Sequence, residues 1–299
     1  MKNTSLFVIA IMMIVITSCN QEPAQTTTEE TVAETNLAKV PADWIDARVA
    51  AAKSKLEATE AGQIVWKAME AHGGLDKWYA NGPISFRFNY QPLDGSTQRD
   101  TYETVDTWRN RTRHQDAADQ SAEYGFDGGK FWEMTQDSAH FAYNVRFWSL
   151  TPYYFMAQPF ILDGAGVNLE KLPQKQYKDQ THDVVKVTFD AGTGDAPDDY
   201  YILHFNAENS QLEVIRYIVS YPGYFEKGKH LPEKFMELYG SQTVNGIILP
   251  EYYQTHWLNE SEGPGEYITR IDLTDVKFQP EVEDGYFAMP QEAKELKSL

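Results

Sequence analysis

The hydrophobic period of the chain changes near Ile84, which separates a helical segment from a longer part rich in strands. Before this point, apolar residues recur three and four positions apart in two segments, one opened by Pro41 and one beginning near Glu60. Such spacing puts apolar side chains on one helical face, and Gly73-Gly74 is a typical C-terminal cap. The pattern predicts two amphipathic helices, over 41–56 and 60–72.

From Ile84 onward, apolar and polar residues mainly alternate, as they do in strands that bury one face. Asp127-Gly128-Gly129 and Asn245-Gly246 are typical of tight hairpin turns. The glycine- and proline-containing passage 163–173 is expected to be a connection, with strands resuming at Gln176. About eleven strands at hairpin spacing predict an α+β fold, mostly antiparallel β, with one large sheet that is curled or partly closed.

An aromatic block interrupts these strands between His140 and Leu162. Polar residues and Pro152 break it, so it is no transmembrane span, and its apolar positions do not alternate as in a strand. A helical stripe fits it better, with Pro152 ending or kinking the helix. The stripe consists of Phe141, Val145, Trp148 and Leu150. We expect an apolar plug inserted into the β structure, an arrangement that indicates a cavity.

Five aromatic residues of this block are the predicted ligand-binding residues, because small-ligand cavities are mainly apolar with a few polar groups. They are Tyr143, Trp148, Tyr153, Tyr154 and Phe155. Core packing alone would explain most of the block and remains the alternative. Arg146 is expected to be exposed or ion-paired, with an anionic head group as the alternative partner.

The N-terminal residues are typical of a targeting signal that is cleaved from the mature protein. Lys2 precedes an unbroken apolar run over 6–16, too short for a membrane span, and small residues lead to Cys19. This order resembles a bacterial lipoprotein signal, which implies loss of residues 1–18 and lipidation, for example with palmitate, of Cys19. An ordinary secretory signal with a structural cysteine is the alternative.

The mature chain divides by composition into a short polar segment and one large domain. Residues 19–40 contain few large apolar side chains and are expected to be a disordered, solvated tether. Residues 41–299 are expected to form a single domain that includes the N-terminal helices. Cys19 is the only cysteine, so no disulfide within the chain and no cysteine-based metal site is possible.

Charge and motifs narrow the classes of function. The net charge of −18 argues against nucleic acid and against basic patches that adhere to anionic membranes. No nucleotide-binding or hydrolase motif occurs, and no cofactor or metal is predicted. The acidic loop 190–199 is expected to be a solvated hairpin loop, with a Ca²⁺ site as the alternative. Seven scattered histidines leave open a hydrolase with a histidine–carboxylate pair at the barrel mouth.

Four local features in this order resemble the lipoprotein-carrier fold of the LolA and LolB type, over roughly Gln63 to Pro290. They are Ala71-His72-Gly73-Gly74 followed by Trp78, Tyr124-Gly125-Phe126-Asp127-Gly128, Gln158-Pro159-Phe160-Ile161-Leu162 and Asp284-Gly285-Tyr286-Phe287. A Bacteroidetes group of lipoproteins is more similar still. The resemblance implies a curved, incomplete β-barrel with helices covering its concave face, able to hold acyl chains or another apolar ligand.

The predicted function combines this resemblance with the anchor. Carriers that shuttle lipoproteins are soluble, whereas Cys19 would tether this chain, which favours a receptor, sensor or static binding role. We expect a cell-envelope lipoprotein, in the outer membrane with its domain in the periplasm or on the cell surface, that binds a hydrophobic or amphipathic small molecule or lipid. An enzyme is less expected, and a scaffold without a small ligand remains the third possibility. The sequence does not identify a protein partner.

Overall fold

A computed structural model of the chain describes residues 36–297. The predicted signal peptide, Cys19 and most of the predicted tether lie outside these residues. Just before the first helix, Ala38 and Val40 are buried, and the backbone N–H of Ala38 donates to the carbonyl of Val282. Across 36–297, no helix combines the length and the apolar character that a membrane crossing requires.

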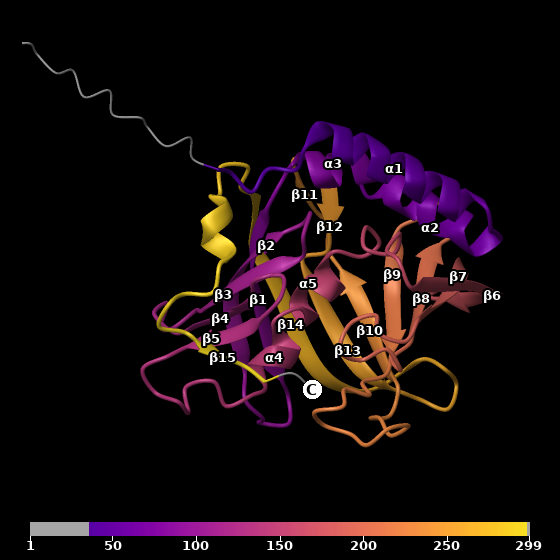
Figure 1. The fold of residues 1–299 in the computed structure, drawn as a ribbon. Helices are drawn as coiled ribbons and strands as arrows, with labels where there is room; N and C mark the ends of the chain where they lie inside the picture. Colours follow the sequence, from indigo (N-terminus) through magenta and orange to yellow (C-terminus); the bar gives the residue numbers. More distant parts are fainter. Residues whose placement is uncertain (1–35, 298–299) are drawn as a thin grey trace, which may run out of the picture. The chain divides into compact units, whose positions relative to one another are not determined.

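One antiparallel sheet dominates the fold (Figure 1). Its thirteen strands follow the order β15-β5-β4-β3-β2-β1-β14-β13-β10-β9-β8-β7-β6, and β11 pairs with β12 in a separate hairpin. The strands are β1 Ile84–Pro92, β2 Arg99–Asp106, β3 Arg111–Asp116, β4 Glu123–Phe126, β5 Phe131–Met134, β6 Val167–Tyr177, β7 Gln180–Phe189, β8 Tyr201–Asn206, β9 Leu212–Tyr217, β10 Lys234–Tyr239, β11 Gln242–Val244, β12 Ile247–Leu249, β13 Tyr252–Leu258, β14 Pro264–Phe278 and β15 Lys294–Glu295. The α+β class and the single large antiparallel sheet are confirmed.

Two details of the predicted sheet need correction. The sheet is open, with β15 and β6 at its two edges. It is neither closed nor strongly curled, so the curvature expected of an incomplete barrel is not found. The strand number exceeds eleven, and β6 begins at Val167, inside the passage expected to be a connection, rather than at Gln176. As an edge strand β6 is exposed along most of its length, and it shifts register around Pro173. It therefore lacks the alternation that identifies a half-buried strand.

The N-terminal helices confirm the helical spacing of the sequence and lie together at one end of the sheet (Figure 1). Thr59 caps the second helix by accepting a hydrogen bond from the Gly62 backbone N–H, and Gly73 and Gly74 leave it with positive φ. The helices are α1 Ala42–Glu57, α2 Glu60–Ala71 and α3 Leu75–Ala80, followed later by α4 Val145–Trp148 and α5 Thr151–Met156; a 3₁₀ helix η1 spans Asp284–Phe287.

The aromatic block forms two short helices rather than one helix ended by a proline. Pro152 lies in the first turn of α5, where its missing N–H leaves no hydrogen bond unmade. Asn144 caps α4 by accepting a hydrogen bond of 3.1 Å from the Phe147 backbone N–H. The proline therefore begins the second helix, and the chain bends between Trp148 and Thr151.

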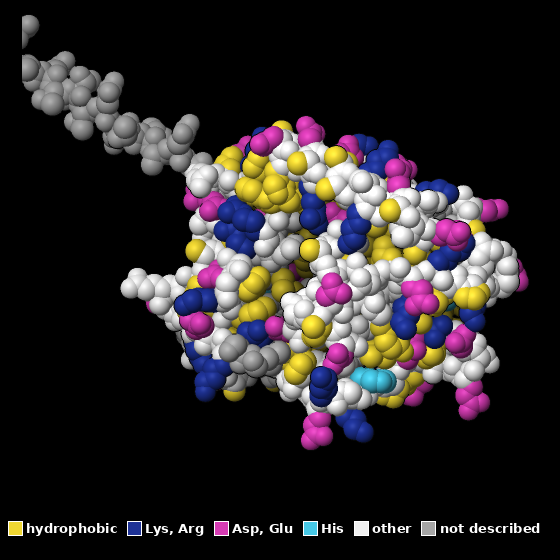
Figure 2. Space-filling model, turned by 45° about the vertical axis from the view of Figure 1, so that its right-hand side comes forward, with side chains coloured by type: hydrophobic (Ala, Val, Ile, Leu, Met, Phe, Trp, Pro, Cys, Tyr) yellow, Lys and Arg dark blue, Asp and Glu magenta, His cyan; other side chains and the backbone are white. Residues whose placement is uncertain are grey.

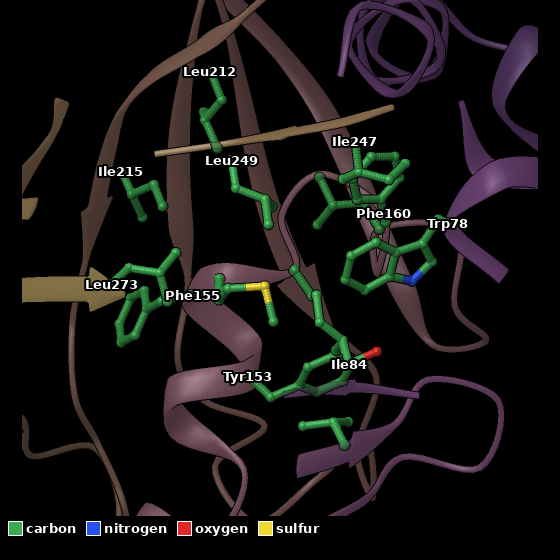
Figure 3. Packing of buried hydrophobic residues seen from close by; sticks show 14 of the residues in the cluster. Trp78, Ile84, Tyr153, Phe155, Phe160, Leu212, Ile215, Ile247, Leu249 and Leu273 are labelled. Atoms are coloured by element: carbon green, nitrogen blue, oxygen red, sulfur yellow. The ribbon is translucent and has the colours of Figure 1, made fainter. Parts of the chain in front are cut away.

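The aromatic block lies inside the molecule, as the plug interpretation requires. Figure 3 shows Tyr153, Phe155 and Phe160 among apolar side chains from the sheet, from α3 and from β12. Phe160 has no exposed surface and stacks on Trp78, with ring centroids 4.7 Å apart and planes 6° from parallel. Such stacking adds about 1 kcal/mol to the free energy gained by burial alone. The core thus fixes α5 against the sheet.

Candidate functional site

A cavity of about 600 Å³ lies beside the aromatic block. That volume falls within the range typical of small-ligand sites. Its walls come from α4 and α5, from the segment that follows them, and from β1 and β4–β10 with their loops. Most of the side chains that form these walls are aromatic or aliphatic, so the interior favours an apolar ligand.

The structure brings four of the five predicted residues to this cavity: Trp148, Tyr153, Tyr154 and Phe155 all line it. Tyr143 does not line it, and packs instead near the rings of Tyr124, Phe141 and Trp148. Because α4 starts only at Val145, Tyr143 lies in the loop before the helix and faces strand β4. Its predicted role in binding therefore finds no support in its position.

Strand β3 holds the joint between α4 and α5 in place. The carbonyl of Ser149 accepts hydrogen bonds from Thr112 Oγ1 at 2.7 Å and from His114 Nε2 at 3.0 Å. Burial lowers the pKa of His114 to about 3, so its imidazole is neutral at pH 7. This histidine has a structural role, because it positions the two helices that form one wall of the cavity.

The sheet supplies a second aromatic wall that the sequence analysis did not identify. Tyr201 of β8 and Tyr217 of β9 are paired in the strand register and stack, with centroids 6.0 Å apart. Phe189 of β7 lies 6.0 Å from Tyr201, and Tyr154 of α5 lies 4.8 Å from it. Aromatic residues on neighbouring predicted strands were the sequence signal that could have identified this wall.

The charged side chains at the cavity mostly have partners of their own. Arg146 pairs with Asp195 at 2.8 Å and packs over the ring of Phe131, which confirms the ion-paired expectation. Asp199 accepts hydrogen bonds from the backbone N–H and the hydroxyl of Ser220. These charges are locally satisfied and leave little capacity for a ligand.

Lys234 is the exception among the basic residues that line the cavity. Within residues 36–297, its Nζ has no hydrogen-bond acceptor and no carboxylate at ion-pair distance. It lies 5.7 Å from the ring centroid of Tyr217 and 5.5 Å from that of Trp257. Burial, and then the positive charge of Arg99, lower its pKa to about 8. An unpaired ammonium group thus faces an otherwise apolar cavity.

The hydroxyl group of Tyr154 is a second polar group without a partner. This oxygen is buried, and no donor or acceptor among the described residues reaches it. Desolvation raises the pKa of Tyr154 above its usual value, so the group stays a neutral phenol. A ligand with one polar atom in its chain would find a hydrogen-bond partner here.

None of the seven histidines lines this cavity. His114 lies 3.4 Å from Glu103, but both side chains have no exposed surface, and His182 pairs with Glu213 away from the cavity. Burial raises the pKa of Glu103 well above its usual range. Neither of these two pairs lies at the cavity, so the hydrolase alternative gains no support from it.

The acidic loop 190–199 uses its carboxylates within the fold. Asp190 accepts a hydrogen bond from Asn168, while Asp195 and Asp199 bind the partners described above. In the part of the chain that the structure describes, no group of three or more histidine, cysteine, aspartate or glutamate side chains converges as metal ligands do.

The outer surface offers no comparably large apolar site in the view of Figure 2. Hydrophobic side chains appear there as separate patches between acidic and basic ones. Leu37, Leu93 and Tyr224 are the large hydrophobic residues that stay exposed within 36–297. Scattered exposure of this kind is ordinary for a protein surface.

The fold is similar to that of a solved structure. A LolA superfamily protein from Nitrosomonas europaea matches with a TM-score of 0.50 and 12% sequence identity, over 77% of this chain and 98% of that protein. A putative outer membrane lipoprotein-sorting protein domain from Vibrio parahaemolyticus matches with a TM-score of 0.46 and 10% identity, over 75% of this chain and 94% of that domain. No protein-family model matches the sequence. No curated protein matches it either.

These findings bear on the fold alone. The structure is LolA-like, in agreement with the resemblance seen in the sequence. At this level of identity, function and ligand do not follow from the similarity.

Proposed function

We propose that this protein, on its LolA-like fold, binds a hydrophobic or amphipathic ligand, a lipid or an acyl chain, in the cavity beside α4 and α5. The observation that carries the proposal is the cavity of about 600 Å³ with four predicted aromatic residues on one wall and three further aromatic residues on strands β7, β8 and β9. Those three are Phe189, Tyr201 and Tyr217. An aromatic cavity gains free energy when an apolar chain replaces water.

We further propose that the protein is a lipoprotein of the cell envelope, anchored through acyl chains on Cys19 in the outer membrane. Two or more acyl chains suffice for stable anchoring, whereas one does not. The test is metabolic labelling with a radioactive fatty acid in the wild type and in Cys19→Ser. Label in the wild type and none in the variant is expected; equal labelling would show that the anchor lies elsewhere.

Anchoring favours a static receptor or sensor over a shuttle. A lipidated protein stays at its membrane, so the ligand must arrive there and leave by another route. We therefore expect the ligand-bound protein to act at its own membrane rather than to carry the ligand elsewhere.

Binding is tested with full-length Cys19→Ser protein purified without detergent. Native mass spectrometry and lipid extraction should find a co-purified apolar molecule, and delipidated protein should bind the dye Nile red. Val219 lines the cavity, and Val219→Trp should fill part of it and reduce both signals several-fold. Leu93→Trp is the control, because Leu93 is 53% exposed and lies outside the cavity.

Two outcomes would contradict the proposal. Absence of any co-purified molecule together with absence of dye binding would favour a scaffold that has no small ligand. Equal loss of binding in Val219→Trp and Leu93→Trp would place the dye on the surface rather than in the cavity.

A further inference from the structure

The cavity has an uneven charge distribution. Three basic residues line it: Arg109, Arg146 and Lys234. The first pairs with Asp106 at 3.1 Å and the second with Asp195 at 2.8 Å. Lys234 alone among them has neither a carboxylate nor a hydrogen-bond acceptor within residues 36–297.

The strand explains why no neighbouring acid reaches this ammonium group. Successive residues of a strand point to opposite faces. Glu233, the residue before Lys234, binds Arg216 at 2.7 Å and the hydroxyl of Tyr200 at 2.8 Å. Lys234 instead shares its face with Met236, which is fully buried against the core. The positive charge is thus held on the apolar side of the sheet.

Arg99 adds a second cation beside the cavity, which it does not itself line. Its guanidinium stacks on Tyr90 and Trp148, with distances of 5.0 and 4.8 Å from the central carbon to the ring centroids. Both rings also line the cavity. Its Nε is buried without a partner, and it forms no ion pair with any carboxylate of the described residues. Its charge is close enough to Lys234 to lower that residue's pKa.

Two neighbouring cations without counter-charges each disfavour the charged form of the other, and an anion beside them would relieve that repulsion. A carboxylate or phosphate beside Lys234 would supply the missing charge and accept charge-assisted hydrogen bonds from its ammonium group. A neutral head group would leave the charge uncompensated. The aromatic walls described above provide the place for the attached chain.

We infer that the ligand is an anionic amphiphile, with a carboxylate or phosphate head group at Lys234, next to Arg99, and its hydrocarbon chain among the aromatic residues of the cavity. This inference rests on the proposed function and specifies its ligand class. Lys234 is the binding group for the head, and Arg99 strengthens the positive potential around it.

The test compares four probes of equal chain length on delipidated full-length Cys19→Ser protein at pH 7. Dodecanoate, dodecyl phosphate, dodecanol and dodecyltrimethylammonium compete with Nile red for the cavity. Both anions should displace the dye at concentrations at least tenfold lower than the alcohol, and the cation should displace it least. The stronger of the two anions identifies the natural head group as a carboxylate or a phosphate.

Variants locate the head group. Lys234→Met keeps the length of the side chain and should weaken both anions about tenfold or more while changing dodecanol less than twofold; Arg99→Gln should weaken the anions by a smaller factor. Lys186→Met is the matched control, since Lys186 also lies on a strand near a tyrosine ring, 5.3 Å from Tyr200, but outside the cavity. It should bind all four probes as the unsubstituted protein does.

The possible failures are distinguishable. If Nile red and dodecanol bind but the anions show no advantage, or if Lys234→Met weakens anions and alcohol equally, the anionic head group is refuted and the apolar cavity stands. If neither the dye nor any probe binds, the proposed function itself fails, and the inference fails with it.

Discussion

Replacing Lys234 by methionine is expected to stabilise the ligand-free protein at pH 7. Burial and Arg99 lower the pKa of Lys234 from 10.5 to about 8 in the folded state. A tenfold change in proton affinity corresponds to about 1.4 kcal/mol, so the charged form destabilises the folded protein by about 3 kcal/mol. Methionine has a similar length and no charge, and should remove this destabilisation.

The pH dependence follows from the direction of the pKa change. Between about pH 8 and pH 10.5, the unfolded chain holds the Lys234 proton and the folded chain has lost it. The free energy of unfolding of the wild type should therefore rise with pH through this window relative to Lys234→Met. The advantage of the variant, about 3 kcal/mol below pH 8, should vanish near pH 10.5.

The assay is urea denaturation followed by circular dichroism, with both proteins measured at several values between pH 7 and pH 10.5. Other titrating groups are common to both proteins and cancel in the difference. Lys234→Arg is the matched variant, because a guanidinium stays charged throughout this range and should remain destabilised at pH 10.5. A constant difference between wild type and Lys234→Met across the window would refute a buried, unpaired ammonium group.

Three further outcomes follow from other parts of the structure. Burial raises the pKa of Glu103, so the stability of the wild type should fall as pH rises toward that pKa. In urea denaturation above pH 6.5, where His114 is neutral in the folded and the unfolded protein, Glu103→Gln should be more stable than the wild type. Gly125→Ala should lower the free energy of unfolding by about 2 kcal/mol or more, because a Cβ would lie 2.2 Å from the Thr112 carbonyl oxygen. The control Gly129→Ala should change the free energy of unfolding by less than about 1 kcal/mol. Equal losses of stability in thermal denaturation of the two variants would contradict the close packing at Gly125. Raising salt should accelerate the association of dodecanoate in stopped-flow experiments, because the net charge of −18 repels anions at long range; slower association would indicate local attraction at the entrance.

Secondary structure was predictable where one face of an element is buried. Helix α2 and strand β1 bury one side, so their apolar residues recur with the period of the element. The first part of strand β6 was taken for a connection because it lies at the sheet edge and is largely exposed. Pro152 was misplaced because a proline can both end one helix and begin the next, and the sequence does not distinguish the two.

The cavity was predictable from the aromatic block, but its charge was not. Trp148 and Tyr153 to Phe155 line the cavity because they belong to the short helices that the block forms. Lys234 shares a strand face with the buried Met236, which was the available sign that it lies on the core side of the sheet. Its isolation depends on Glu233 binding Arg216 across strands, and such pairing becomes visible only when the strands are placed in register.

The net charge of the chain and the charge of the cavity lead to opposite expectations for an anionic ligand. An excess of 18 negative charges acts at the surface, where salt screens interactions beyond about 10 Å. Lys234 acts at the cavity wall, with Arg99 beside it, where the effective dielectric constant is lower than in water and each charge interacts more strongly. The acidic surface therefore opposes adhesion to anionic membranes, while the interior still selects an anionic head group once a single molecule has entered the cavity.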